Sequence, residues 1–261
     1  MAKALASLAL ATCLVAASPP QTVTVLYAGS LVTPMEGPIA QALARQDITF
    51  EGEGRGSQEI ANFITAGLRN PDVVIVVDPA IMARLARAGL IAQSWTLGGA
   101  TLGIALAKHH PPSIRFDEAN VPFSTQLLDG SGMRIARTDP RLDPKGRYTI
   151  EAVRMLVGAR GERQLFGADE NPAQIFPEQD LLVRLETGEA DWGVVYSTEA
   201  RARHLEFIPF PGRASMSDEI RYVVAVMKGA PHPKAARAFV EFLLHGTGRR
   251  ILEAAGLAKH A

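Results

Sequence analysis

Short apolar runs alternate with amphipathic segments along most of this chain. Residues 23–26 and 72–78 are nearly continuous apolar runs bounded by polar residues, a pattern typical of strands buried on both faces. Segment 58–68 instead places its apolar residues at helical spacing. This alternation of strand and helix predicts an α/β fold built on doubly wound sheets.

The same reading extends to the C-terminal end of the chain, where no internal repeat interrupts it. Helices are expected at 35–44, 58–68, 80–88, 149–157, 178–187 and 233–244. Strands are expected at 23–26, 48–50, 72–78, 101–107, 133–137, 192–196 and 220–227.

Two turns of small residues each join a strand-like run to a helix-like run. The first is Ala28-Gly29-Ser30, and the second is the glycine-rich stretch 51–57, which ends in Ser57. The first N–H groups of a helix lack partners within the helix, and the helix dipole adds positive potential there. Such a turn can hold an anion. Ser30 and Ser57 add hydroxyl donors and also suit an N-cap position, so capping alone explains either serine equally well.

Composition narrows the chemistry of any partner. The chain has 261 residues, 47% of them hydrophobic, with 27 Lys and Arg against 27 Asp and Glu. This is ample material for a core, and the zero net charge with no basic run argues against a nucleic-acid partner. Anion binding would therefore depend on local dipoles and hydroxyl groups. We expect a monomer that needs no cofactor.

The N-terminal residues have the pattern of a targeting segment. Met1-Ala2-Lys3 is a short positive start, residues 4–15 are apolar, and Ala16-Ala17 provides small residues for cleavage. The apolar run is too short to span a bilayer. We expect residues 1–17 to be a signal peptide and the mature protein to be periplasmic.

Lipid anchoring is the alternative fate of the N-terminus. Cys13 is the single cysteine and stands at a lipobox-like place, although Thr12 is a poor residue to precede it. If Cys13 is cleaved off with the signal peptide, the mature chain has no thiol and no disulfide.

Six segments follow one another in a recognisable order and spacing. They are Ala28-Gly29-Ser30-Leu31, Gly54-Arg55-Gly56-Ser57, 72–78, Arg137-Thr138-Asp139-Pro140, Asp143-Pro144-Lys145-Gly146 and 185–196. In this order the chain resembles the periplasmic molybdate/tungstate-binding proteins of ABC importers, from about residue 22 to its end. The resemblance rests on order and spacing, because no single motif is specific.

The resemblance implies a type II periplasmic-binding-protein fold, in which two lobes close on a ligand between them. It implies one lobe formed by 22–103 plus 219–261 and a second formed by 104–218. The ligand would be molybdate or tungstate, delivered to an ABC permease in the inner membrane. The implied ligand contacts are the hydroxyls of Ser30, Ser57 and Tyr196 and the backbone N–H groups of Lys145 and Glu178.

Some relatives add two carboxylates to the coordination of the metal in the oxyanion. Asp143 stands where one of these would lie, whereas Val195 stands at the second position and cannot coordinate. A carboxylate facing a dianion would repel it, so we expect Asp143 to turn away or to cap the local backbone. We expect no free metal cation, and Asp143 stays a candidate ligand contact.

The remaining residues leave three alternatives open. The same fold could bind sulfate, phosphate or another small anion, which present similar acceptors. It could also act as a sensor subunit that signals to a membrane receptor. An exported hydrolase would need a histidine or lysine base beside Ser30 or Ser57, and no sequence motif supplies one. Tyr196, at the end of an apolar run, is explained equally well as a core residue.

Overall fold

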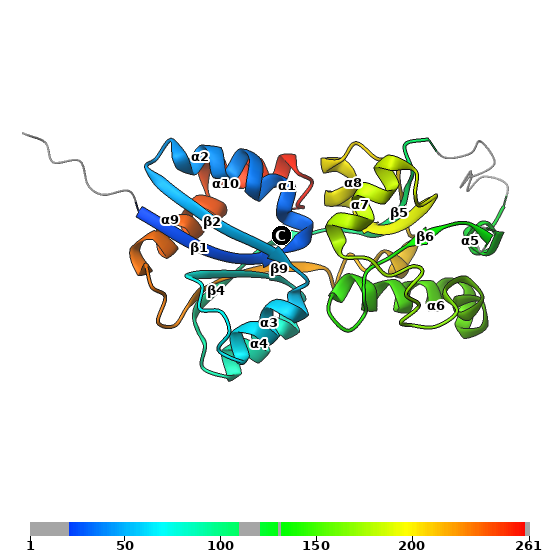
Figure 1. Cartoon of the computed structure of the whole chain (residues 1–261), viewed down its shortest axis with the longest axis horizontal. Helices are drawn as coiled ribbons and strands as arrows, with labels where there is room; N and C mark the ends of the chain where they lie inside the picture. The colour runs from blue at the N-terminus through cyan, green and yellow to red at the C-terminus, as the bar shows by residue number, and fades with distance from the viewer. Residues whose placement is uncertain (1–20, 110–120, 130–131, 259–261) are drawn as a thin grey trace, which may run out of the picture.

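The computed structural model describes residues 21–109, 121–129 and 132–258. The expected signal peptide and Cys13 lie outside these residues. Two sheets lie side by side along the long axis of the molecule, each with its own helices (Figure 1). No helix among the described residues is long and apolar enough to cross a bilayer.

The first sheet has the strand order β2-β1-β3-β9-β4. Strand β9 runs antiparallel to both of its neighbours, β3 and β4. Helices α3 and α4 cover one face, and α2, α9 and α10 cover the other (Figure 1). The strands are β1 (Gln21–Ala28), β2 (Ile48–Arg55), β3 (Val73–Val77), β4 (Ile91–Gly99) and β9 (Arg221–Met227). The helices are α1 (Val32–Pro34), α2 (Ala40–Ala44), α3 (Ser57–Thr65), α4 (Pro79–Arg87), α9 (Pro233–Leu244) and α10 (Gly246–Ala254), with short helical turns η1 (Gly29–Leu31) and η2 (Met35–Ile39).

The second sheet has the order β6-β7-β5-β8. Its strands are β5 (Leu102–Leu106), β6 (Ile135–Ala136), β7 (Trp192–Tyr196) and β8 (Phe207–Pro209). Its helices are α5 (Phe123–Asp129), α6 (Pro144–Phe166), α7 (Glu178–Thr187) and α8 (Ser197–Ala202), and the turn η4 (Gly212–Ser215) precedes β9. Gly158 adopts a positive φ of 71° and kinks α6.

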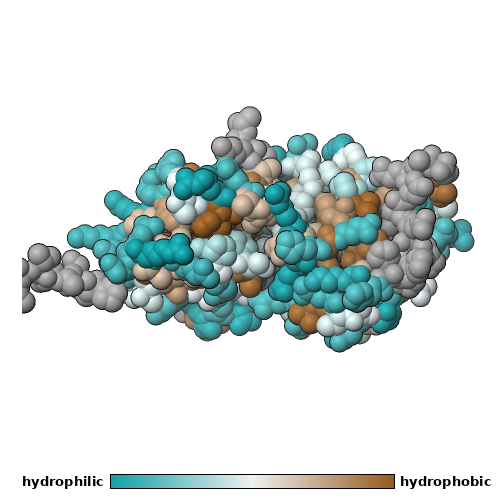
Figure 2. Space-filling view, turned by 90° about the horizontal axis from the view of Figure 1, so that it is seen from above, coloured by the Kyte–Doolittle hydropathy of each residue, from teal (hydrophilic) through white to brown (hydrophobic). Residues whose placement is uncertain are grey.

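The central strand β3 explains why the first sheet is stable. All five of its residues are buried. Val73, Ile75 and Val77 face one apolar cluster, whereas Val74 and Val76 face the cluster under α3 and α4. This two-sided burial is what a continuous apolar run predicts. Hydrophilic side chains cover most of the face seen in Figure 2, and apolar side chains gather there in separate groups.

The chain passes between the two sheets twice. It leaves the first sheet after Gly99 and enters the second at Leu102, and it returns between Pro209 and Arg221. The lobe boundaries expected at residues 103/104 and 218/219 stay a prediction. The expected crossing near residue 103 falls just inside β5.

Two segments expected to be loops are regular structure. The glycine-rich stretch after Phe50 continues β2 as far as Arg55, paired with β1 throughout. Gly52 and Gly54 permit this pairing because a Cβ at either position would collide with side chains, including that of Tyr27. Likewise α6 begins at Pro144 rather than at Thr149. The sequence reading also missed β4, β8, α5, α8 and α10.

Candidate functional site

The two predicted serines lie at one edge of the first sheet. Strands β1 and β2 are parallel neighbours, and their last residues, Ala28 and Arg55, are paired. Ser30 and Ser57 each follow one of these ends by two residues, and they are only 6% and 2% exposed. The topology therefore brings both serines to the C-terminal ends of adjacent strands, as the two small-residue turns predicted.

Each serine oxygen accepts a hydrogen bond from the protein. The Val77 N–H donates to Ser57 Oγ at 2.9 Å, and the Tyr222 hydroxyl donates to Ser30 Oγ at 2.8 Å. Val77 and Tyr222 are cross-strand partners of β3 and β9, so the two contacts are adjacent. The predicted N-cap role is wrong, because neither η1 nor α3 has a side-chain cap. Each serine therefore keeps its own hydroxyl hydrogen to donate.

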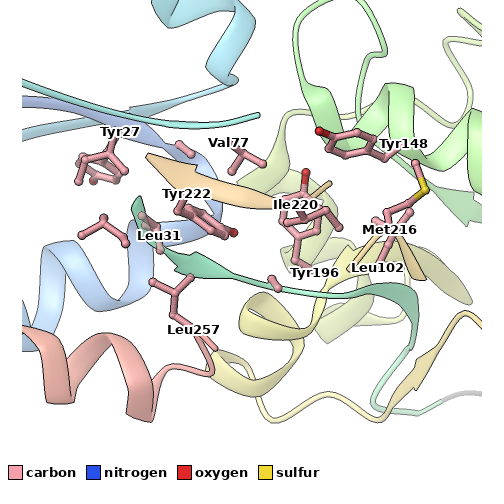
Figure 3. Packing of buried hydrophobic residues seen from close by; sticks show 14 of the residues in the cluster. Tyr27, Leu31, Val77, Leu102, Tyr148, Tyr196, Met216, Ile220, Tyr222 and Leu257 are labelled. Atoms are coloured by element: carbon pink, nitrogen blue, oxygen red, sulfur yellow. The ribbon is translucent and has the colours of Figure 1, made fainter. Parts of the chain in front are cut away.

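The molecule has two halves, each formed by one sheet with its helices, and a pair of tyrosines lies where they meet. The ring centroids of Tyr196 and Tyr222 are 6.3 Å apart, with the rings at 73° (Figure 3). Tyr196 is buried, and its hydroxyl has no hydrogen-bond partner among the described residues. Burial raises the pKa of both phenols, so they are neutral donors. Tyr222 was missed by the sequence reading, because within a strand-like run nothing marks it as different from a core residue.

The two halves touch across the edge that carries the serines. The backbone N–H groups of Gln58 and Glu59, at the start of α3, donate to the Leu142 carbonyl at 3.2 and 3.3 Å. Arg147 of α6 pairs with Asp78 at the end of β3. In this closed arrangement a carbonyl from the second half occupies the α3 N–H groups that were expected to face an anion.

Asp143 caps the helix that follows it. Its Oδ1 accepts from the Lys145 N–H at 2.8 Å, so this N–H, predicted to bind the ligand, is engaged within the protein. The carboxyl group is buried, and burial, followed by the nearby Glu178, raises its pKa to about 7. Asp143 nevertheless lies beside the first half, because its Cα is 3.6 Å from the position that a Cβ on Gly56 would occupy.

The Lys145 ammonium lies between two carboxylates. Nζ donates to Glu178 Oε1 at 2.7 Å and to Glu199 Oε1 at 2.6 Å, and the lysine is fully buried. Glu199 Oε2 also accepts from the Tyr196 N–H at 2.7 Å, at the start of α8. The ion pairs raise the pKa of Lys145 against the effect of burial, so it stays charged. The sequence reading found neither this cluster nor Glu199.

Glu178 joins the two halves through its side chain. It begins α7, as predicted, but its carboxyl group extends to Lys145 and to the backbone of Gly29 in the first half. A Cβ on Gly29 would collide with Glu178 Oε2, so the two residues are in close contact. The side chain is 9% exposed, and burial raises its pKa to about 8.

The hydrogen bonds to Ser30 and Ser57 do not activate either serine as a nucleophile. The groups bonded to Ser30 and Ser57, a phenol and a backbone N–H, are donors and cannot remove a serine proton. Within the described ranges, no three His, Cys, Asp or Glu side chains form a group that could hold a metal ion. What remains is a set of three hydroxyl donors and one ammonium group paired with two carboxylates, close to where the two halves meet.

Comparison with known proteins identifies the family of this chain. The profile of the family described as bacterial extracellular solute-binding protein matches residues 23–258. An uncharacterized solute-binding protein of Halobacterium salinarum is 30% identical over 251 residues, covering 85% of this chain and 80% of its own length. The chain belongs to this family of solute-binding proteins.

Two further comparisons bear on fold and ligand. The molybdate-binding protein ModA of Mycobacterium tuberculosis is 32% identical over 208 residues, which cover 78% of this chain and 71% of that protein. The solved structure of the Azotobacter vinelandii periplasmic molybdate-binding protein has a TM-score of 0.74 at 18% identity, covering 92% of this chain and all of that one. The fold is therefore that of type II periplasmic binding proteins, as the resemblance implied.

Proposed function

We propose that this family member binds a tetrahedral oxyanion, molybdate or tungstate, between its two sheets and delivers it to an ABC permease. The observation that carries the proposal is the hydrogen bonding of three hydroxyl groups. Ser30 and Ser57 have their oxygens held by protein donors, and the buried Tyr196 hydroxyl has no partner among the described residues. Three hydroxyl hydrogens are thus left for acceptors.

A fully deprotonated tetrahedral anion supplies such acceptors. Each charge-assisted hydrogen bond to a buried anion contributes about 1.5–3 kcal/mol net. Three such hydroxyl donors offset part of the cost of removing a dianion from water. The name of the mycobacterial relative supports molybdate, and opening and closing of the two halves would admit the anion and exclude water.

The proposal includes the route of the protein. Family membership implies an extracellular role, and the N-terminal pattern supports export by cleavage of residues 1–17. The closed form would be the species that an inner-membrane permease recognises.

Isothermal titration with molybdate, tungstate, sulfate and phosphate tests the proposal. We expect one site per chain, with molybdate or tungstate bound more tightly than the other two anions. The alanine double variant of Ser30 and Ser57 should lose binding and keep its fold. Absence of saturable heat with molybdate and with tungstate would end this proposal.

A further inference from the structure

Two carboxyl groups contact one ammonium group where the halves meet, and a third carboxyl group lies nearby. Glu178 and Glu199 both accept from Lys145 Nζ, and Asp143 lies two residues before this lysine at the start of α6. One ammonium compensates one carboxylate, so with all three ionised the cleft carries excess negative charge. A dianion entering such a site would face strong repulsion unless positive charge entered with it.

The three carboxyl groups differ in the hydrogen bonds that they make. Both oxygens of Glu199 accept a bond, one from Lys145 Nζ and one from the Tyr196 N–H. Asp143 accepts from the first free N–H of α6. Glu178 accepts from Lys145 through Oε1, and its Oε2 lies against Gly29. A hydrogen bond also links the Glu178 and Glu199 side chains, which requires a proton on one of these two carboxyl groups. Glu178 therefore gains least from being ionised.

We propose that the Glu178 side chain contacts the bound oxyanion as a neutral carboxylic acid, and that one proton is taken from solvent with each dianion. This inference rests on the proposed function, and it concerns the side chain rather than the backbone N–H of Glu178. An ionised carboxylate offers only acceptors, whereas the acid offers an O–H donor. Protonation thus removes a repulsion and adds a fourth hydroxyl donor to the site.

The surroundings of Glu178 set where this proton exchange becomes visible. Burial raises the pKa to about 8, Lys145 opposes that effect and Glu199 adds to it. The titratable groups around the carboxyl group come from several elements. They are Lys145 on α6, Asp143 just before α6, Glu199 on α8, Tyr196 on β7 and Tyr222 on β9. The Gly29 turn, which carries no charge, also lies against it. At pH 8.5 the free carboxyl is mostly ionised, so binding should take up about 0.8 proton there and close to none at pH 6.5.

The experiment is calorimetric titration of the full protein with sodium molybdate at pH 8.5 and 6.5. Each titration is run in two buffers that differ in ionisation enthalpy, and the difference in heat gives the protons taken up. For the wild type, affinity should fall about tenfold from pH 7 to pH 9. Glu178→Gln should bind with no proton uptake and with an affinity that changes by less than about threefold over that range.

A matched variant and a fold check keep the result interpretable. Asp180→Asn alters an exposed carboxylate on the same helix and should behave as the wild type. Circular dichroism establishes that Glu178→Gln is folded, and the pH dependence of the wild type decides the question if it is not. Molybdate binding without proton uptake at pH 8.5, or equal uptake by wild type and Glu178→Gln, overturns this inference and leaves the proposed function intact.

Two further outcomes count against it. Preference for hydrogen phosphate over molybdate at pH 8.5 would mean that an ionised Glu178 accepts a hydrogen bond from the hydroxyl group of the ligand, which overturns the inference. Absence of binding by wild-type protein at both pH values would overturn the proposed function and this inference together.

Discussion

The buried Glu178 carboxyl predicts that stability of the ligand-free protein falls as the pH rises. Its pKa is about 8 in the folded protein against an ordinary 4.5, so the folded state binds more protons than the unfolded state between these values. Stability from this group is complete below pH 4.5 and is lost as the pH rises through 8. The shift corresponds to about 3–5 kcal/mol.

Glu178→Gln isolates this contribution, because glutamine cannot ionise and can still accept from Lys145 through its carbonyl oxygen. The stability of the variant relative to wild type should therefore increase by about 3–5 kcal/mol between pH 5 and pH 9. The difference between the two proteins cancels the titration of carboxyl groups that do not interact with Glu178. Asp143 does interact with it, because the pKa of Asp143, about 7, is raised partly by Glu178, so its titration contributes to the measured difference.

Urea denaturation at several pH values, followed by tryptophan fluorescence and circular dichroism, measures the effect. Trp192 is fully buried at the start of β7, the strand that ends at Tyr196, and reports on the second half. Coincident transitions by the two probes would justify a two-state treatment. A stability difference that stays constant from pH 5 to pH 9 would refute the reasoning, because Glu178 would then titrate alike in the folded and unfolded states.

Three other substitutions test separate contacts. Tyr222→Phe removes the donor that orients the first serine and should weaken molybdate binding about tenfold by calorimetry, whereas Tyr27→Phe, outside the site, should not. Gly29→Ala places a Cβ against Glu178 Oε2 and should hold the halves apart, seen as a larger radius of gyration by small-angle scattering, with closure restored by adding Glu178→Ala. Lys145→Met leaves two buried carboxylates without a cation and should cost about 3–5 kcal/mol at pH 8.5 in urea denaturation, and less at pH 5.

The elements that were predicted well are those whose own sequence decides their environment. The apolar run of β3 must be buried on both faces wherever it lies, and α7 and α9 begin after prolines or polar residues and end as predicted. Strand β4 was missed because its residues are mixed in polarity and largely exposed along the first half. It is a strand because β9 pairs with it along most of its length.

The residues of the candidate site also differ in whether the local sequence reveals them. Ser30 and Ser57 are found from local pattern, because a strand, a small-residue turn and a helix follow one another in sequence. Their hydrogen-bond partners are not, since Tyr222 lies 192 residues from Ser30. The alternative of helix capping fails for a separate reason: the N-cap residues of η1 and α3 are Ala28 and Gly56, so each serine lies inside its helical turn.

The charge of the cleft limits how selectivity can arise. Lys145 is the cation of the site, and its two glutamates already compensate it, so no net positive charge is left to attract every anion equally. Under the proposed function, the binding energy would then come from hydroxyl groups whose positions depend on closure. The lengths of the bonds from Gln58 and Glu59 to Leu142 O, 3.2 and 3.3 Å, define how closely the two halves approach. Because molybdate and sulfate present similar acceptors on spheres of different size, this approach distance would set which of them the hydroxyls reach together.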